Sequence, residues 1–128
     1  MIVSDDRVAE YVGRRVGHPI VPPYSTLGVE RGGRVVAGIV FNVYTGPDAQ
    51  LTIAAEPGAM TKPFLRRVGE YLTEELGCIR GTVETEQPAV VEMALRMGGK
   101  VEGVKRHLFG HGRHGTVIGI LKDEWFLR

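Results

Sequence analysis

Apolar residues recur along the chain at two periods, and the period changes in a definite order. Helical spacing predicts helices over residues 5–16, 61–76 and 88–97. Apolar runs bounded by turn residues predict strands over residues 27–30, 35–43, 51–55, 79–84, 101–109 and 116–121. Antiparallel strands come first and helical crossovers follow. The pattern therefore predicts an α/β fold with a mixed, mostly antiparallel central sheet of about five or six strands and helices on both faces.

Local signals mark the ends of several elements. Ser4 is the expected N-cap of the first helix, and Gly17 is the residue expected to end it. Gly32 and Gly33 are expected to form the hairpin turn between the first two strands. Segment 18–26 contains three prolines, so we expect an extended surface loop of the kind that often borders a site.

The composition fits a single globular domain over residues 1–128, of which 43% are apolar. Sixteen basic and fifteen acidic residues give a net charge of +1, so bulk charge does not indicate a nucleic-acid partner. No apolar run is long enough to span a membrane, and the first residues lack the features of a signal peptide. The single cysteine, Cys78, is expected to be buried rather than catalytic. We predict a cytoplasmic protein without a membrane partner.

The start of the helix at Thr61 is the first candidate site. The first N–H groups of a helix have no partner inside it, and this helix directly follows the strand 51–55. A pyrophosphate bound there would accept those hydrogen bonds and gain from the helix dipole, and Lys62 would add positive charge. Strand–loop–helix units without any ligand have the same local sequence, so both interpretations stay open.

From Leu27 to Trp125 the order of elements resembles the GNAT superfamily of acetyl-CoA-dependent N-acyltransferases, and the strand 35–43 resembles a strand of members found among prophage-like proteins. Segment 56–61 occupies the place of the family's pyrophosphate loop, Gln/Arg-x-x-Gly-x-Gly/Ala. Segments 101–106 and 121–125 resemble the family's next strand and its last segment. The spacing of the family's second motif is matched by Gln87, Val90, Ala94, Gly98 and Gly99.

The chain departs from the family pattern at functional positions. Ala59 and Thr61 stand where the loop has glycines, and Glu56 replaces its basic or amide residue. Gln87 replaces an asparagine of the second motif. Ala94 stands at the place of the tyrosine that often protonates the leaving thiolate in the family.

The resemblance implies that coenzyme A lies between the strands that end at Ala55 and Glu84, which splay apart in this family. A backbone N–H of the strand 51–55 would then polarise the thioester carbonyl. The residues implied to bind the cofactor are Ile53, Ala54, Ala55, Ala59, Met60, Thr61, Lys62 and Gln87.

An amine must attack in its neutral form, so a base or a chain of waters must take its proton. Glu84, at the end of its strand, is the first candidate base, and Tyr44 is the second. A solvated strand terminus is the alternative interpretation of Glu84. Asn42 and Tyr44 end a central strand and are candidate substrate contacts, with ordinary turn chemistry as the alternative.

Three histidines near the C-terminus are a candidate metal site. His107, His111 and His114 have the spacing of one helix face, but Gly110 and Gly112 argue against a helix there. We therefore expect a hairpin tip and no metal.

The predicted function is transfer of an acetyl group from acetyl-CoA to a primary amine by direct attack, without a covalent enzyme intermediate. The alternative is a catalytically inactive GNAT-fold module that binds acyl-CoA or another protein. The acceptor is a small-molecule or peptide amine that the sequence does not specify further. Exposed hairpin edges are compatible with a homodimer.

Overall fold

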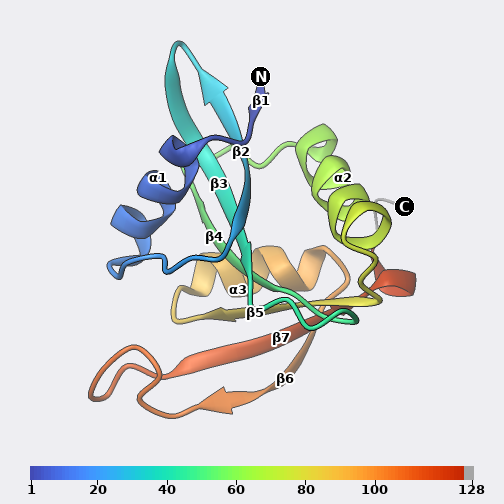
Figure 1. Cartoon of the computed structure of the whole chain (residues 1–128). Coiled ribbons are helices and arrows are strands. Elements are labelled where there is room, and N and C mark those ends of the chain that lie inside the picture. Colours follow the sequence, from blue (N-terminus) through green and yellow to red (C-terminus); the bar gives the residue numbers. More distant parts are fainter. Residues whose placement is uncertain (126–128) are drawn as a thin grey trace.

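A computed structural model describes residues 1–125, in which a single twisted sheet runs through the molecule (Figure 1). Its seven strands lie in the order β1-β2-β3-β4-β5-β7-β6, and every neighbouring pair is antiparallel except β4 and β5. The strands are β1 (Ile2–Val3), β2 (Ser25–Arg31), β3 (Arg34–Asn42), β4 (Gln50–Ala55), β5 (Arg80–Thr85), β6 (Lys100–Lys105) and β7 (Gly115–Leu121). The predicted fold class is confirmed, and the additional strand is β1, a short segment paired with β2.

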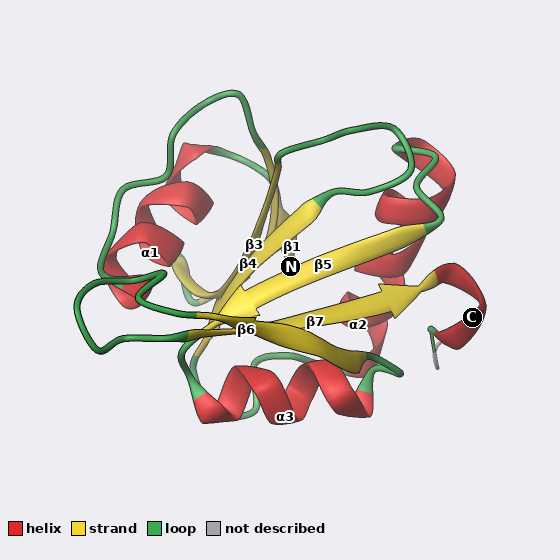
Figure 2. Cartoon of the chain, turned by 90° about the horizontal axis from the view of Figure 1, so that it is seen from below, coloured by secondary structure: helices red, strands yellow, loops and turns green. Residues whose placement is uncertain are grey.

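The helices lie on both faces of this sheet (Figure 1). They are α1 (Asp6–Val16), α2 (Lys62–Glu70) and α3 (Pro88–Arg96), together with a π-helical turn (Tyr71–Glu75) after α2 and a short 3₁₀ turn (Lys122–Glu124). Figure 1 shows α1 and α2 on opposite sides of β2, β3 and β4, and Figure 2 shows α3 running along β5, β6 and β7. In the part of the chain described, no helix is long and apolar enough to cross a membrane.

Capping residues fix where the helices begin. The cap of α1 is Asp5, not Ser4 as predicted, because the Asp5 carboxylate accepts the N–H of Arg7 at 3.0 Å. Gly17 ends α1 with φ 79°, in the left-handed conformation that glycine adopts without strain. Thr61 caps α2, as the sequence predicts, through its Oγ1, which accepts the N–H of Phe64.

The core is divided by the sheet into two apolar clusters. On one face, Val8 and Val12 of α1 pack against Val40 and Ala54. On the other face, α2 and α3 cover a larger cluster of side chains, among them Phe64, Leu72, Met97, Leu51, Ile53, Val83, Ile118 and Ile120. Cys78 is buried in this second cluster, and burial raises the pKa of its thiol, as expected of a structural cysteine.

Two predicted strands end earlier than the hydrophobic pattern indicates. β6 stops at Lys105 rather than residue 109, because the chain turns at His107, which has φ 57°. The hairpin tip therefore spans residues 106–114, longer than expected. β3 stops at Asn42, because Val43 adopts φ 48° and cannot continue the strand.

Candidate functional site

β4 and β5 lie side by side at one end and separate at the other. They pair only through Gln50 with Thr82 and Leu51 with Val83. β4 nevertheless stays paired with β3 along its whole length, up to Ala55. The parallel pair is therefore splayed beyond Leu51, as the resemblance implies.

The splay leaves main-chain groups of β4 without partners. The N–H of Glu56 donates to β3 at 2.8 Å, and the main-chain groups of successive residues in a strand point to alternate sides. Those of Ala54 therefore point toward β3, whereas those of Ile53 and Ala55 point toward β5. Because the pairing of β4 with β5 ends at Leu51, the N–H groups of Ile53 and Ala55 have no hydrogen-bond partner within residues 1–125, while Arg15 donates to the Ala55 carbonyl at 2.9 Å. Two free donors thus face the gap between the strands.

The loop from β4 to α2 uses part of its own hydrogen-bonding capacity. The Ala59 N–H donates to the carbonyl of Glu56 at 3.1 Å, and the Thr61 N–H donates to the carbonyl of Ala59 at 3.0 Å. The Glu56 carboxylate forms an ion pair with Arg34 at 2.7 Å, which lowers the pKa of Glu56. Its negative charge is therefore compensated by the β2–β3 hairpin.

Other groups of the same loop are free to bind a ligand. The N–H groups of Gly58, Met60 and Lys62 have no partner within the described residues. Met60 and Lys62 line a cavity of about 260 Å³ between the start of α2 and the end of α3, where Arg96 adds a second cation. Free N–H donors at a helix start and two basic side chains form an environment suited to an anion.

Glu84 lies on the α1 face of β5, at the edge of a different cavity. Its Oε1 accepts the side-chain N–H of Gln50 at 2.9 Å, and its Oε2 forms an ion pair with Lys105. The Glu84 side chain is only 10% exposed. The cavity measures about 330 Å³, and Thr52, Ile53 and Gln87 line it together with Glu84 and Gln50. Because Ile53 lines this cavity, the carboxylate pocket adjoins the splayed segment of β4.

The outer wall of this pocket comes from two loops that are distant in sequence. His18, just after α1, stacks on Phe109 of the β6–β7 tip with ring centroids 5.8 Å apart. Arg113 of the same tip pairs with Glu86, its Nε lying 2.9 Å from Oε1. This pairing lowers the pKa of Glu86 and raises the pKa of Arg113. Leu108 adds an apolar surface to the wall.

Asn42 and Tyr44 lie elsewhere. They line a separate hollow of about 680 Å³ with the loop that contains Pro22 and Pro23. The Tyr44 hydroxyl donates to the Leu76 carbonyl at 2.9 Å, which anchors the end of the π-helical turn. The structure thus does not bring Tyr44 into the pocket of Glu84, and the predicted roles of Asn42 and Tyr44 stay predictions.

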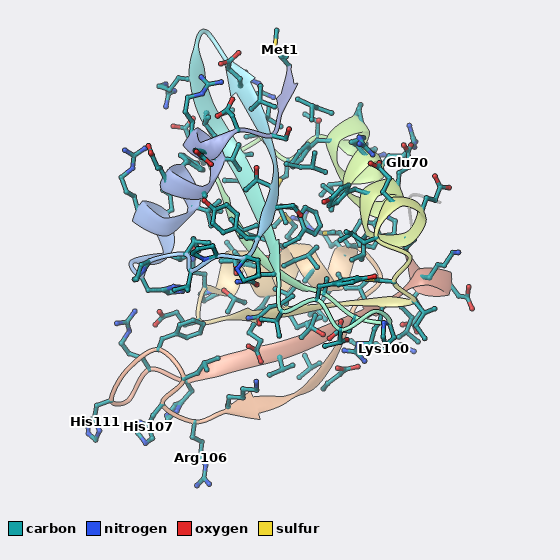
Figure 3. All side chains as sticks on the ribbon, viewed as in Figure 1. Met1, Glu70, Lys100, Arg106, His107 and His111 are labelled. Atoms are coloured by element: carbon teal, nitrogen blue, oxygen red, sulfur yellow. The ribbon has the colours of Figure 1, made fainter. Side chains whose placement is uncertain are left out.

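The three histidines are close together at the hairpin tip, where Figure 3 shows His107 and His111 pointing outward. The Nδ1 of His107 accepts the N–H of Gly112 at 2.8 Å, and the Nδ1 of His114 accepts the N–H of His107 at 3.0 Å. These ring nitrogens hold the turn together. Across residues 1–125, no group of three or more His, Cys, Asp or Glu side chains is arranged to hold a metal.

Comparison with known proteins gives a match in structure and none in sequence. No family model and no curated protein matches the chain. A variant of the spermidine N-acetyltransferase SpeG from Vibrio cholerae is 12% identical, with a TM-score of 0.73 over 98% of this chain and 95% of that chain. A variant of the spermidine/spermine N-acetyltransferase SpeG from the same organism is 15% identical, with a TM-score of 0.69 over 96% and 95%. The chain has the GNAT fold. At these identities the likeness concerns the fold alone.

The cofactor side of this site and Glu84 were predictable from the sequence, whereas the other residues of the Glu84 pocket were not. The GNAT resemblance indicated the splay, the loop before α2 and Glu84. It did not indicate His18, Gln50 or Arg113, which meet Glu84 or its pocket only through the register of the sheet and the fold of the hairpin tip. One available signal was the proline-rich segment 18–26, which begins at His18 and is of the kind that often borders a site.

Proposed function

We propose that this GNAT-fold chain is an N-acetyltransferase that moves an acetyl group from acetyl-CoA to a primary amine. The observation that carries the proposal is the splay between β4 and β5, where free main-chain donors of Ile53 and Ala55 lie beside the pocket of Glu84. The named structural neighbours are acetyltransferases that act on the amine spermidine, which supports the same chemistry here.

The residues around the splay are chemically suited to acetyl-CoA. Its pyrophosphate would accept hydrogen bonds from Gly58, Met60 and Lys62, with the Lys62 and Arg96 side chains supplying positive charge. Its pantetheine amides would pair with the free main-chain groups of Ile53 and Ala55. The N–H groups of Ala59 and Thr61 already form hydrogen bonds inside the loop. These two predicted contacts would therefore hold the shape of the loop and donate no hydrogen bond to the cofactor.

The chain's own groups then have distinct tasks in the transfer. Acetyl-CoA supplies an activated thioester. A main-chain N–H of β4 polarises its carbonyl, and Glu84 holds the acceptor ammonium and takes its proton, directly or through water. The amine nitrogen bonds to the acetyl carbon as the C–S bond breaks, and the thiolate takes a proton from solvent because Ala94 supplies no hydroxyl. The products are an N-acetylamine, coenzyme A thiol and one proton released to solvent.

Calorimetric titration with acetyl-CoA tests the cofactor site. We expect micromolar binding, and binding at least about tenfold weaker for S-acetylpantetheine, which lacks the pyrophosphate. Lys62→Ala should weaken acetyl-CoA several-fold and leave S-acetylpantetheine unchanged, whereas Lys122→Ala, on the 3₁₀ turn and outside the cavity, should alter neither. Absence of binding at millimolar acetyl-CoA would remove the basis of the proposal.

An inactive acyl-CoA-binding or protein-interaction module is the second candidate. Ala94 favours it, because this buried residue replaces the family's usual proton donor. Binding of acetyl-CoA without thiol release in the presence of any amine would favour the inactive module over the acetyltransferase.

Self-association is part of the proposal. One SpeG structure is described as dodecameric. In this chain the edge strand β6 exposes Val101 and Val104 to 53% and 61%, an apolar edge suited to a second copy.

A further inference from the structure

The pocket beside Glu84 is balanced in charge. Two carboxylates, Glu84 and Glu86, line it, and each already has a cationic partner, Lys105 and Arg113 respectively. Arg113 itself lines the pocket. An amine entering this pocket therefore meets positive as well as negative side chains.

A polyamine fits this arrangement poorly. Its ammonium groups can approach Glu84 and Glu86 only by displacing Lys105 and Arg113, and it brings no anion to compensate these cations. The displaced cations would then repel the ligand. Such uncompensated like charges are a standard means of rejecting a ligand.

An amine with its own anionic group fits the same charges. Its ammonium would replace Lys105 at Glu84. Its anion would accept two parallel N–H hydrogen bonds from the Arg113 guanidinium, whose planar geometry matches a carboxylate. Breaking the Arg113–Glu86 ion pair costs little free energy, because the Arg113 side chain is 53% exposed and exposed ion pairs contribute little to stability. Two ion pairs form for the two that are broken, and the side chains released, Lys105 and Glu86, have opposite charges, whereas a polyamine would release two cations.

We propose that the acceptor is a small amino-carboxylate, bound with its ammonium on Glu84 and its carboxylate on Arg113. This inference rests on the proposed acetyltransferase function. The cavity of about 330 Å³ has room for a molecule of amino-acid size, and Leu108 and Phe109 in its wall suit an apolar body.

Matched acceptor pairs that differ only in the carboxylate test this inference. Leucine is compared with isopentylamine, phenylalanine with phenethylamine and lysine with cadaverine, following thiol release from saturating acetyl-CoA. We expect kcat/KM to be at least about tenfold higher for the carboxylate member of an accepted pair. Amino acids are also less basic than the matched amines, so a larger fraction is neutral and their kcat/KM rises for that reason alone. The deciding quantity is therefore the change that Arg113→Gln makes in the ratio of kcat/KM between the two members of a pair.

Arg113→Gln should lower the ratio at least about tenfold, as expected for the loss of one charged contact. Arg106→Gln is the matched control, since Arg106 lies on the same tip, points outward in Figure 3 and does not line the pocket. An equal or higher kcat/KM for the plain amines, or a ratio unchanged in Arg113→Gln, overturns the inference while the transferase stands. If acetyl-CoA binds and no acceptor of any pair reacts, the inference is also wrong. Failure of acetyl-CoA to bind would instead count against the proposed function itself.

Discussion

Replacing Glu84 by glutamine is expected to lower kcat/KM for the amine acceptor about 100-fold or more, because the amide cannot take the proton that the attacking amine must lose. Glutamine preserves the size of the side chain, and its carbonyl oxygen can still accept from Gln50, which contacts Glu84 at 2.9 Å. Acetyl-CoA affinity should stay unchanged, since the residues proposed to bind the pyrophosphate lie at the start of α2. Steady-state thiol release and calorimetry on the same preparation measure the two quantities.

Glu102→Gln is the matched control for this variant. Glu102 lies on β6, pairs with Arg80 and does not line the pocket of Glu84. It should retain the activity of the parent chain. Equal activity of Glu84→Gln and the parent would show that water alone takes the proton, and Glu84 would then only contact Gln50 and Lys105.

Replacing Gly98 by alanine is expected to lower the free energy of unfolding by about 3 kcal/mol or more. Gly98 has φ 104°, and a Cβ there would lie 1.8 Å from the carbonyl oxygen of Glu124. The segment after α3 would have to move away from the 3₁₀ turn that precedes Trp125. Urea denaturation monitored by circular dichroism measures the change.

Gly103→Ala is the matched control, because it replaces a glycine by alanine without creating such a clash. Gly103 lies on β6, and a Cβ there meets no heavy atom within 4 Å. We expect a change of less than about 1 kcal/mol. Similar losses in both variants would contradict the contact between Gly98 and Glu124. Gly98, one of the five residues that match the spacing of the family's second motif, thus has a packing role.

The hydrophobic period predicted most of the fold because it reports which face of each element is buried. The helices and the central strands follow that rule. β1 was missed because two residues are too few to show a period. The strand predicted to residue 109 was too long because the turn at His107 depends on hydrogen bonds to its ring and among main-chain groups of the tip, which the hydrophobic pattern does not report.

The candidate site was predictable only where local sequence determines geometry. The loop before α2 and the strand end at Glu84 were found because each is contiguous in sequence. The pairing of Glu84 with Gln50 and Lys105 depends on the neighbours of β5 in the sheet, and that order is invisible in residue spacing. Tyr44, the second candidate base, lies beyond the end of β3 and donates to the Leu76 carbonyl, so its predicted role stays a prediction.

The proposed function requires an acyl-CoA to lie in the splay between β4 and β5. The most direct test is an amide NMR titration of the isotope-labelled chain with acetyl-CoA. We expect the largest shifts at the amides of Ile53, Ala55, Met60 and Lys62, with those of Val21 and Val104 unaffected. Shifts confined to the hollow around Asn42, or no shifts at saturating acetyl-CoA, would contradict it.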